Sequence, residues 1–118
     1  MIDQKYITEN LPVYKQAYDL LKYCITLISN LPKNIRIVYG MDIKNNLYNL
    51  INNIYLANSD KDNRLVHINN AITNIRFISL LTRVGFDMNH ITEKQRCNVI
   101  LFTENISKQL HGWKKRSK

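Results

Sequence analysis

Residues 12–29 read PVYKQAYDLLKYCITLIS, and their apolar side chains recur at steps of three and four residues. This spacing predicts an α-helix with one apolar face that packs against other helices. Pro12 suits the first helical position, where its missing N–H group has no partner within the helix. Pro32 disfavours helical backbone at the residue before it, so we expect the helix to end near Ser29.

Three later stretches show the same periodicity and predict helices over about 34–57, from a polar turn at 58–63 to about Val84, and after Thr92 to about Leu110. The residues expected to face inward share the three- and four-residue spacing. They are Val13, Ala17, Leu20, Leu21, Cys24, Leu27 and Ile28; Ile43, Leu47, Leu50, Ile51 and Ile54; Leu65, Ile68, Ile72, Ile75, Ile78 and Leu81; and Cys97, Ile100, Leu101 and Leu110.

Local signals mark the helix ends. Thr92 and Gln95 have the spacing of a capping box at the start of the fourth helix. Gly85 and Gly112 are interpreted as the residues that end the third and fourth helices. Gly40 lies inside the second helix, where glycine is unfavourable. It indicates either a close approach by a neighbouring helix or a loosely wound first turn.

The composition predicts one all-α domain. The chain has 118 residues, of which 45% are hydrophobic, and it contains only three glycines and two prolines. Short connections between helices of similar length favour an antiparallel up-down-up-down four-helix bundle. We expect the bundle to span residues 1–113, followed by a basic tail over residues 114–118.

Four tyrosines widen the apolar surface of the first two helices: Tyr14, Tyr18, Tyr48 and Tyr55. They have two interpretations. They pack in the core, or they form a subunit interface, where tyrosine is enriched.

The sequence shows no secretory signal and no run of about 18 apolar residues, so we expect no membrane span and a cytoplasmic protein. Cys24 and Cys97 are far apart in the sequence and form no paired-cysteine motif. Both are predicted to be buried, reduced thiols.

The charge is strongly basic. The formal net charge is +8, and residues 60–118 carry most of the excess, with four of the basic residues in the last five positions. Such a balance is typical of a protein that binds a polyanion, most commonly nucleic acid. The alternative is a basic surface that only keeps the protein in solution.

Several basic residues follow a helical order. Arg76 and Arg83 are seven residues apart, as are Lys108 and Lys115, so each pair shares a helix face. Each face is either simply solvated or part of a phosphate-binding surface that recognises charge and shape instead of base sequence. The candidate nucleic-acid-binding residues are Arg36, Arg76, Arg83, Lys108, Lys114, Lys115 and Arg116.

Catalytic patterns are missing from the sequence. His67, His90 and His111 lie on different segments, and none has a carboxylate or cysteine at metal-ligand spacing. No phosphate-binding loop, dinucleotide fingerprint or nucleophile elbow occurs. We therefore expect no catalytic residues, no metal and no cofactor, and we predict that the protein is not an enzyme.

Several short segments occur in a characteristic order along the chain: Leu11–Lys15, Tyr18–Leu21, Leu31–Lys33, Arg36, Gly40, Ala57–Asn58, Ile75–Phe77 and Leu110–Lys114. Together they resemble the accessory variability determinant (Avd) proteins of diversity-generating retroelements. His111 stands where that family commonly has glycine. The four-helix-bundle proteins encoded in intervening sequences of 23S ribosomal RNA genes are similar too. Their Ser-Ile-Pro-Ser-Asn-Ile-Ala-Glu-Gly-like stretch is replaced here by LINNIYLAN at residues 50–58, which favours the Avd branch.

The resemblance implies a four-helix bundle that assembles as a homopentamer with a basic surface. It also implies a non-catalytic partnership with a reverse transcriptase and its template RNA or cDNA, in which error-prone cDNA synthesis diversifies a target gene. A protein–protein scaffold with incidental basic charge is the main alternative. A peripheral membrane protein that uses the tail on anionic lipid is a third hypothesis, although weak binding is expected without an anchor.

Overall fold

The computed structural model describes residues 8–118, and this part of the chain contains helices and no strand. The long helices are α2 (Pro12–Ser29), α4 (Met41–Ser59), α5 (Arg64–Asp87) and α6 (Glu93–Arg116). The short helix α3 (Lys33–Ile35) and the π-helical turn η1 (Arg36–Gly40) lead directly into α4.

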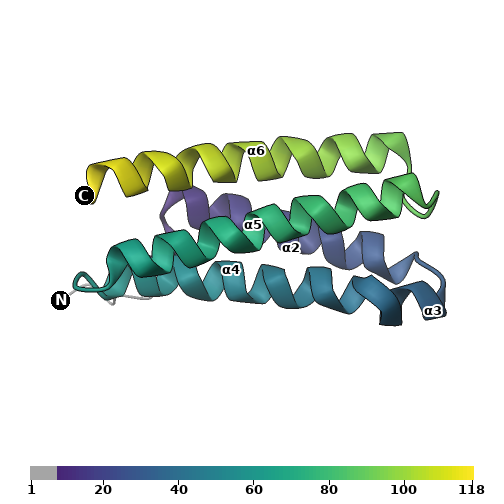
Figure 1. Ribbon diagram of the computed structural model, residues 1–118, viewed down its shortest axis with the longest axis horizontal. Coiled ribbons are helices and arrows are strands. Elements are labelled where there is room, and N and C mark those ends of the chain that lie inside the picture. Colours follow the sequence, from purple (N-terminus) through teal and green to yellow (C-terminus); the bar gives the residue numbers. More distant parts are fainter. Residues whose placement is uncertain (1–7) are drawn as a thin grey trace.

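The four long helices lie side by side along the longest axis of a particle measuring 46 × 26 × 21 Å (Figure 1). Helix α4 packs against α2 and α5, and α6 packs against α5 and α2. The α4–α5 turn lies at the same end as the chain's C-terminus, whereas the α2–α3 and α5–α6 connections lie at the other end (Figure 1). We call these the C-terminal end and the opposite end. The arrangement is consistent with a four-helix bundle.

The core is built mainly from the residues whose spacing predicted it. Leu20, Ile43, Leu47, Leu50, Ile54, Ile68, Ile78 and Leu110 are fully buried. Helix α6 departs from the prediction, because its buried positions are Val99, Thr103, Ile106 and Leu110. The inward prediction was wrong for Cys97, which is exposed, and for Leu101, which is 69% exposed. Thr103 takes a buried position because its hydroxyl donates to the Ile100 carbonyl at 3.2 Å.

Both predicted N-terminal signals are confirmed. Pro12 is the first residue of α2. Thr92 accepts from the Gln95 backbone N–H at 3.1 Å, and the Gln95 side chain accepts from the Thr92 N–H at 2.9 Å, which completes the capping box of α6. Each bond satisfies an N–H group that has no partner within the helix.

Both predicted glycine stops were wrong. Helix α5 continues through Gly85 to Asp87, and Asn89 adopts the left-handed backbone (φ 65°) after it. Helix α6 continues through Gly112 to Arg116 and so includes part of the basic segment. The division of the chain into residues 1–113 and 114–118 stays a prediction.

Both interpretations of Gly40 are confirmed. It ends the π-helical turn η1, and a Cβ there would lie 3.2 Å from the Ile28 side chain of α2. The second helix thus begins loosely wound at the point where α2 approaches it closely.

The two thiols are expected to differ in reactivity. Burial raises the pKa of Cys24 to about 12, so this thiol stays protonated and inaccessible, whereas the Cys97 thiol is exposed. We expect a thiol reagent such as DTNB to modify one cysteine of the folded chain quickly, and the second only in denaturant. Cys97→Ser should remove the fast phase. Rapid reaction of both thiols in the native chain would contradict the packing of Cys24.

None of the helices in the described part of the chain is both long and apolar enough to cross a membrane.

Candidate nucleic-acid interface

The structure separates the predicted binding residues into two groups. Lys108, Lys114, Lys115 and Arg116 lie on the last turns of α6, at the C-terminal end, and Arg76 lies midway along α5. Arg36 and Arg83 lie toward the opposite end, in η1 and near the end of α5 (Figure 1). The Arg83 Nε donates to both carboxylate oxygens of Asp87 at 3.1 Å, so its charge is already paired.

An open groove of about 950 Å³ occupies the C-terminal end, and we call it the α6 groove. It lies between the start of α2, the α4–α5 turn and the last turns of α6. Three cations and one acid line it: Arg64, Lys108 and Arg116, with Glu104. Its other lining residues are the apolar Leu11, Pro12, Val13, Leu101 and Trp113, the amide-bearing Asn58, Asn105 and Gln109, and Gly112. The groove therefore combines positive charge with an apolar wall.

A second hollow, of about 470 Å³, lies between α5 and α6. Arg76 and Ser79 reach it from α5, and Ser107, Lys108 and His111 reach it from α6. Lys108 and Glu104 line both hollows, so the two adjoin across α6. Lys115 follows Lys108 by seven residues and shares its helix face. Arg76, Lys108, Lys115 and Arg116 thus lie on a positively charged surface along the second half of α6, beside the acidic Glu104, and we call it the α6 surface.

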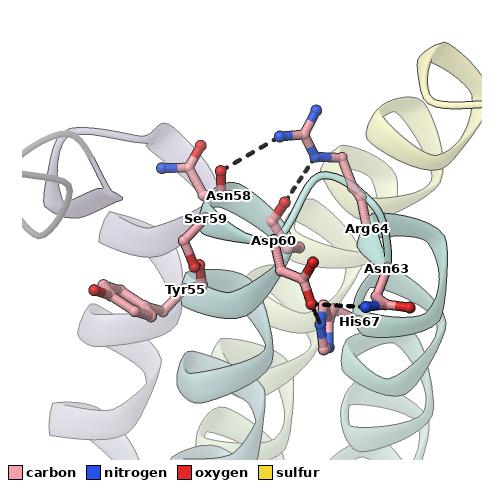
Figure 2. Close-up of polar contacts among 8 residues, drawn as sticks. Tyr55, Asn58, Ser59, Asp60, Asn63, Arg64 and His67 are labelled. Carbon is pink, nitrogen blue, oxygen red and sulfur yellow. Dashed lines mark hydrogen bonds and ion pairs between the residues drawn. The ribbon is translucent and has the colours of Figure 1, made fainter.

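Arg64 is a functional candidate that the sequence analysis missed. Its Nε donates to the Ala57 carbonyl at 2.7 Å and its Nη2 donates to the Asn58 carbonyl at 3.3 Å (Figure 2). These bonds satisfy carbonyl groups at the end of α4. The guanidinium also lies 6.0 Å from the ring centroid of Trp113, within cation–π range. A cation in the first turn of α5 interacts unfavourably with that helix's dipole. This unfavourable position was the only hint in the sequence that Arg64 has partners outside its own helix.

The α4–α5 turn is held by a polar cluster next to Arg64. Asp60 Oδ2 accepts from the Asn63 side-chain amide at 3.0 Å and lies 3.0 Å from His67 Nε2 (Figure 2). The hydrogen bond with His67, followed by the one with Asn63, lowers the pKa of Asp60. The cluster fixes the turn from which Arg64 reaches the groove.

The depressed pKa of Asp60 predicts a pH-dependent contribution to stability. The ionised carboxylate is favoured in the folded chain, so its contribution is present above the ordinary pKa of 3.8 and is lost as the pH falls below it. We expect Asp60→Asn to lower the unfolding midpoint in urea at pH 6, and the difference from the wild type to shrink towards pH 3. Asp62→Asn, in the same turn, is the matched control. A constant difference across this range would contradict the assignment.

The four tyrosines differ in how far they are buried. Tyr14 packs against the core, as the first interpretation predicts. Tyr18 and Tyr48 are 49% and 48% exposed, so core packing does not account for them. Two shallow hollows on the surface of α2 and α4 share Glu9 and Tyr14, one with Tyr48 and Tyr55 and the other with Tyr18. We call this surface the tyrosine face.

Within the described residues, no group of three or more His, Cys, Asp or Glu side chains is placed to hold a metal ion. His67 contacts Asp60, and His90 Nδ1 lies 3.0 Å from the Tyr39 hydroxyl. His111 is exposed and lines the second hollow.

Comparison with known proteins places almost the whole chain in one family. The family model described as bAvd-like matches residues 11–117. No curated protein and no solved structure matches the chain.

Proposed function

Because this chain belongs to the bAvd-like family of Avd-type accessory proteins, we propose that it is the non-catalytic accessory subunit of a diversity-generating retroelement. In this role it binds the element's reverse transcriptase and its template RNA or cDNA in the cytoplasm and supports mutagenic reverse transcription. The family match over residues 11–117 is the observation that carries the proposal. The α6 surface supports it, because it supplies a place for phosphate groups.

The nucleic acid is held chiefly by the α6 surface, with Lys114 alongside it. Lysine and arginine contacts to phosphate position a nucleic acid without reading its sequence. Arg36 and Arg83 serve a nucleic acid only if it follows the bundle along much of its 46 Å length.

The subunit assembles as a homo-oligomer, a pentamer by resemblance to Avd proteins. Its helices follow an antiparallel up-down-up-down order, which the placement of the connections at alternate ends supports (Figure 1). The exposed Tyr18 and Tyr48 make the tyrosine face the surface for contacts between copies.

Co-purification tests the proposal. The tagged chain is co-expressed with the reverse transcriptase and template RNA of a diversity-generating retroelement. We expect both to elute with the chain and the RNA to be released first as salt is raised, because phosphate contacts weaken with ionic strength. Elution of neither partner at low salt would contradict the proposal. Lys33→Gln with Lys94→Gln is a control variant that should retain both partners, because both side chains are exposed and lie outside the α6 surface.

The tyrosine face also favours a second candidate, a protein–protein scaffold whose basic charge is incidental. Removal of residues 114–118 separates the two functions. A scaffold keeps its assembly and its protein partner, whereas an RNA-binding subunit loses affinity for RNA.

A further inference from the structure

We propose that the α6 groove holds one unpaired base of a single-stranded nucleic acid against Trp113 and Arg64, with the flanking phosphates on Lys108 and Arg116. The inference rests on the proposed nucleic-acid binding and assigns its substrate class. It goes beyond phosphate contacts, because it assigns to the groove the recognition of bases that are not stacked in a duplex.

The groove is lined by apolar and aromatic side chains as well as by charged ones. Its cations are accompanied by an aromatic ring and an apolar wall that includes Leu101, whose side chain is 69% exposed. Its volume of about 950 Å³ is within the range of roughly 300–1,000 Å³ found for ligand sites. A nucleobase needs a flat apolar contact and nearby polar groups, and both occur here.

Trp113 and Arg64 are held in place before any ligand arrives. Part of Trp113 packs against the core, while the residue also lines the groove. Arg64 is fixed by its bonds to the Ala57 and Asn58 carbonyls. Proteins stack unpaired bases on aromatic rings and on the plane of arginine guanidinium groups, and the groove offers one of each.

The cations of the groove lie where they can contact the phosphate groups on either side of such a base. Arg116 lies within reach of Gly112, because a Cβ at Gly112 would be 3.3 Å from Arg116 Nη1. Lys108 stands between the groove and the second hollow that holds Arg76. A strand whose base enters the groove therefore continues over Lys108 towards Arg76. Bases within a duplex stay stacked and cannot enter.

Trp113 is the only tryptophan in the chain, so its fluorescence reports directly on the groove. The unaltered protein is titrated with a single-stranded RNA of about ten nucleotides, which is within the usual range of site sizes. A blunt duplex of the same length is the comparison. We expect the single strand to quench Trp113 emission with the same midpoint as its anisotropy titration. The duplex should bind through its phosphates without quenching.

A variant pair gives an independent test by anisotropy. Trp113→Leu should lower single-strand affinity by roughly 5- to 150-fold, the value of one base–aromatic stack, and leave duplex affinity unchanged. Trp113→Phe should retain most of the affinity. Phe77→Leu, which removes another exposed aromatic ring outside the groove, should have no effect.

Each outcome assigns the groove differently. Single-strand binding without a change in Trp113 emission, or equal quenching by the duplex, would overturn the inference and leave phosphate binding intact. No binding of either RNA at low salt would overturn the proposed nucleic-acid binding as well. Weaker binding of the reverse transcriptase by Trp113→Leu, with single-strand affinity unchanged, would overturn the inference and assign the groove to the protein partner.

Discussion

Glutamine at Lys108, Lys115 and Arg116 together is expected to weaken binding of structured RNA by about 100-fold at about 0.15 M salt. Lys108 lines both hollows, Arg116 lines the α6 groove, and Lys115 shares the helix face of Lys108. A salt slope of roughly 0.8 per phosphate makes each contact worth about fivefold at this ionic strength, and the three factors multiply. The slope itself should fall by about 2.4.

A control variant that loses the same charge elsewhere on the protein tests whether the position of the cations matters. Glutamine at Lys22, Lys33 and Lys94 removes the same charge from exposed residues on α2, α3 and α6, away from the C-terminal end. We expect only a small loss of affinity from the general change in the protein's field. Equal losses in the two triple variants would mean that the nucleic acid has no preferred place on the protein.

Alanine at Gly85 is expected to destabilise the fold by about 2 kcal/mol, although alanine is the better helix former. A Cβ at this position would contact Ile91 and would lie 2.9 Å from the Tyr39 hydroxyl, which pairs with His90. Both neighbours are buried, at 3% and 5% exposure, so neither can move without disturbing its own packing. Urea unfolding monitored by circular dichroism measures the difference.

Alanine at Gly112 is the matched control within a helix. There the nearest atom, at 3.3 Å, is the end of the Arg116 side chain, which can move. We therefore expect Gly112→Ala to stabilise the protein by about 0.5–1 kcal/mol. A stable Gly85→Ala variant would show that α5, η1 and the α5–α6 turn do not meet as closely as described.

The sequence was sufficient for the fold wherever apolar periodicity and local signals agree. Helix α2 begins at Pro12 and ends at Ser29 as predicted, and the capping box at Thr92 is confirmed. The periodicity of α6 misled because a buried threonine, Thr103, satisfies its own hydroxyl and takes a core position. A prediction from the spacing of apolar residues alone therefore placed Cys97 and Leu101 in the core, although both are exposed.

The two glycine predictions failed for a different reason. A glycine that ends a helix and a glycine that permits close packing look the same in a sequence. Only the tertiary neighbours distinguish them, and Tyr39 is far from Gly85 along the chain. Gly112, by contrast, has little around it and is simply carried within α6.

Part of the candidate site could be predicted from the sequence. The seven-residue step between Lys108 and Lys115 places both on one face, and the structure brings two other predicted residues, Arg76 and Arg116, to the hollows that Lys108 lines. Arg64 was missed because its partners are the end of α4 and Trp113, which only the fold brings together. The groove itself, formed by segments from α2 to α6, is a tertiary feature without a sequence pattern.

The affinity of the wild-type chain for structured RNA across a series of salt concentrations tests the central claim most directly. Fluorescence anisotropy should give binding at low salt and a linear fall of log affinity with log salt, with a slope of about 2 or more for at least three phosphate contacts. No binding at the lowest salt, or an affinity that does not change with salt, would contradict the account.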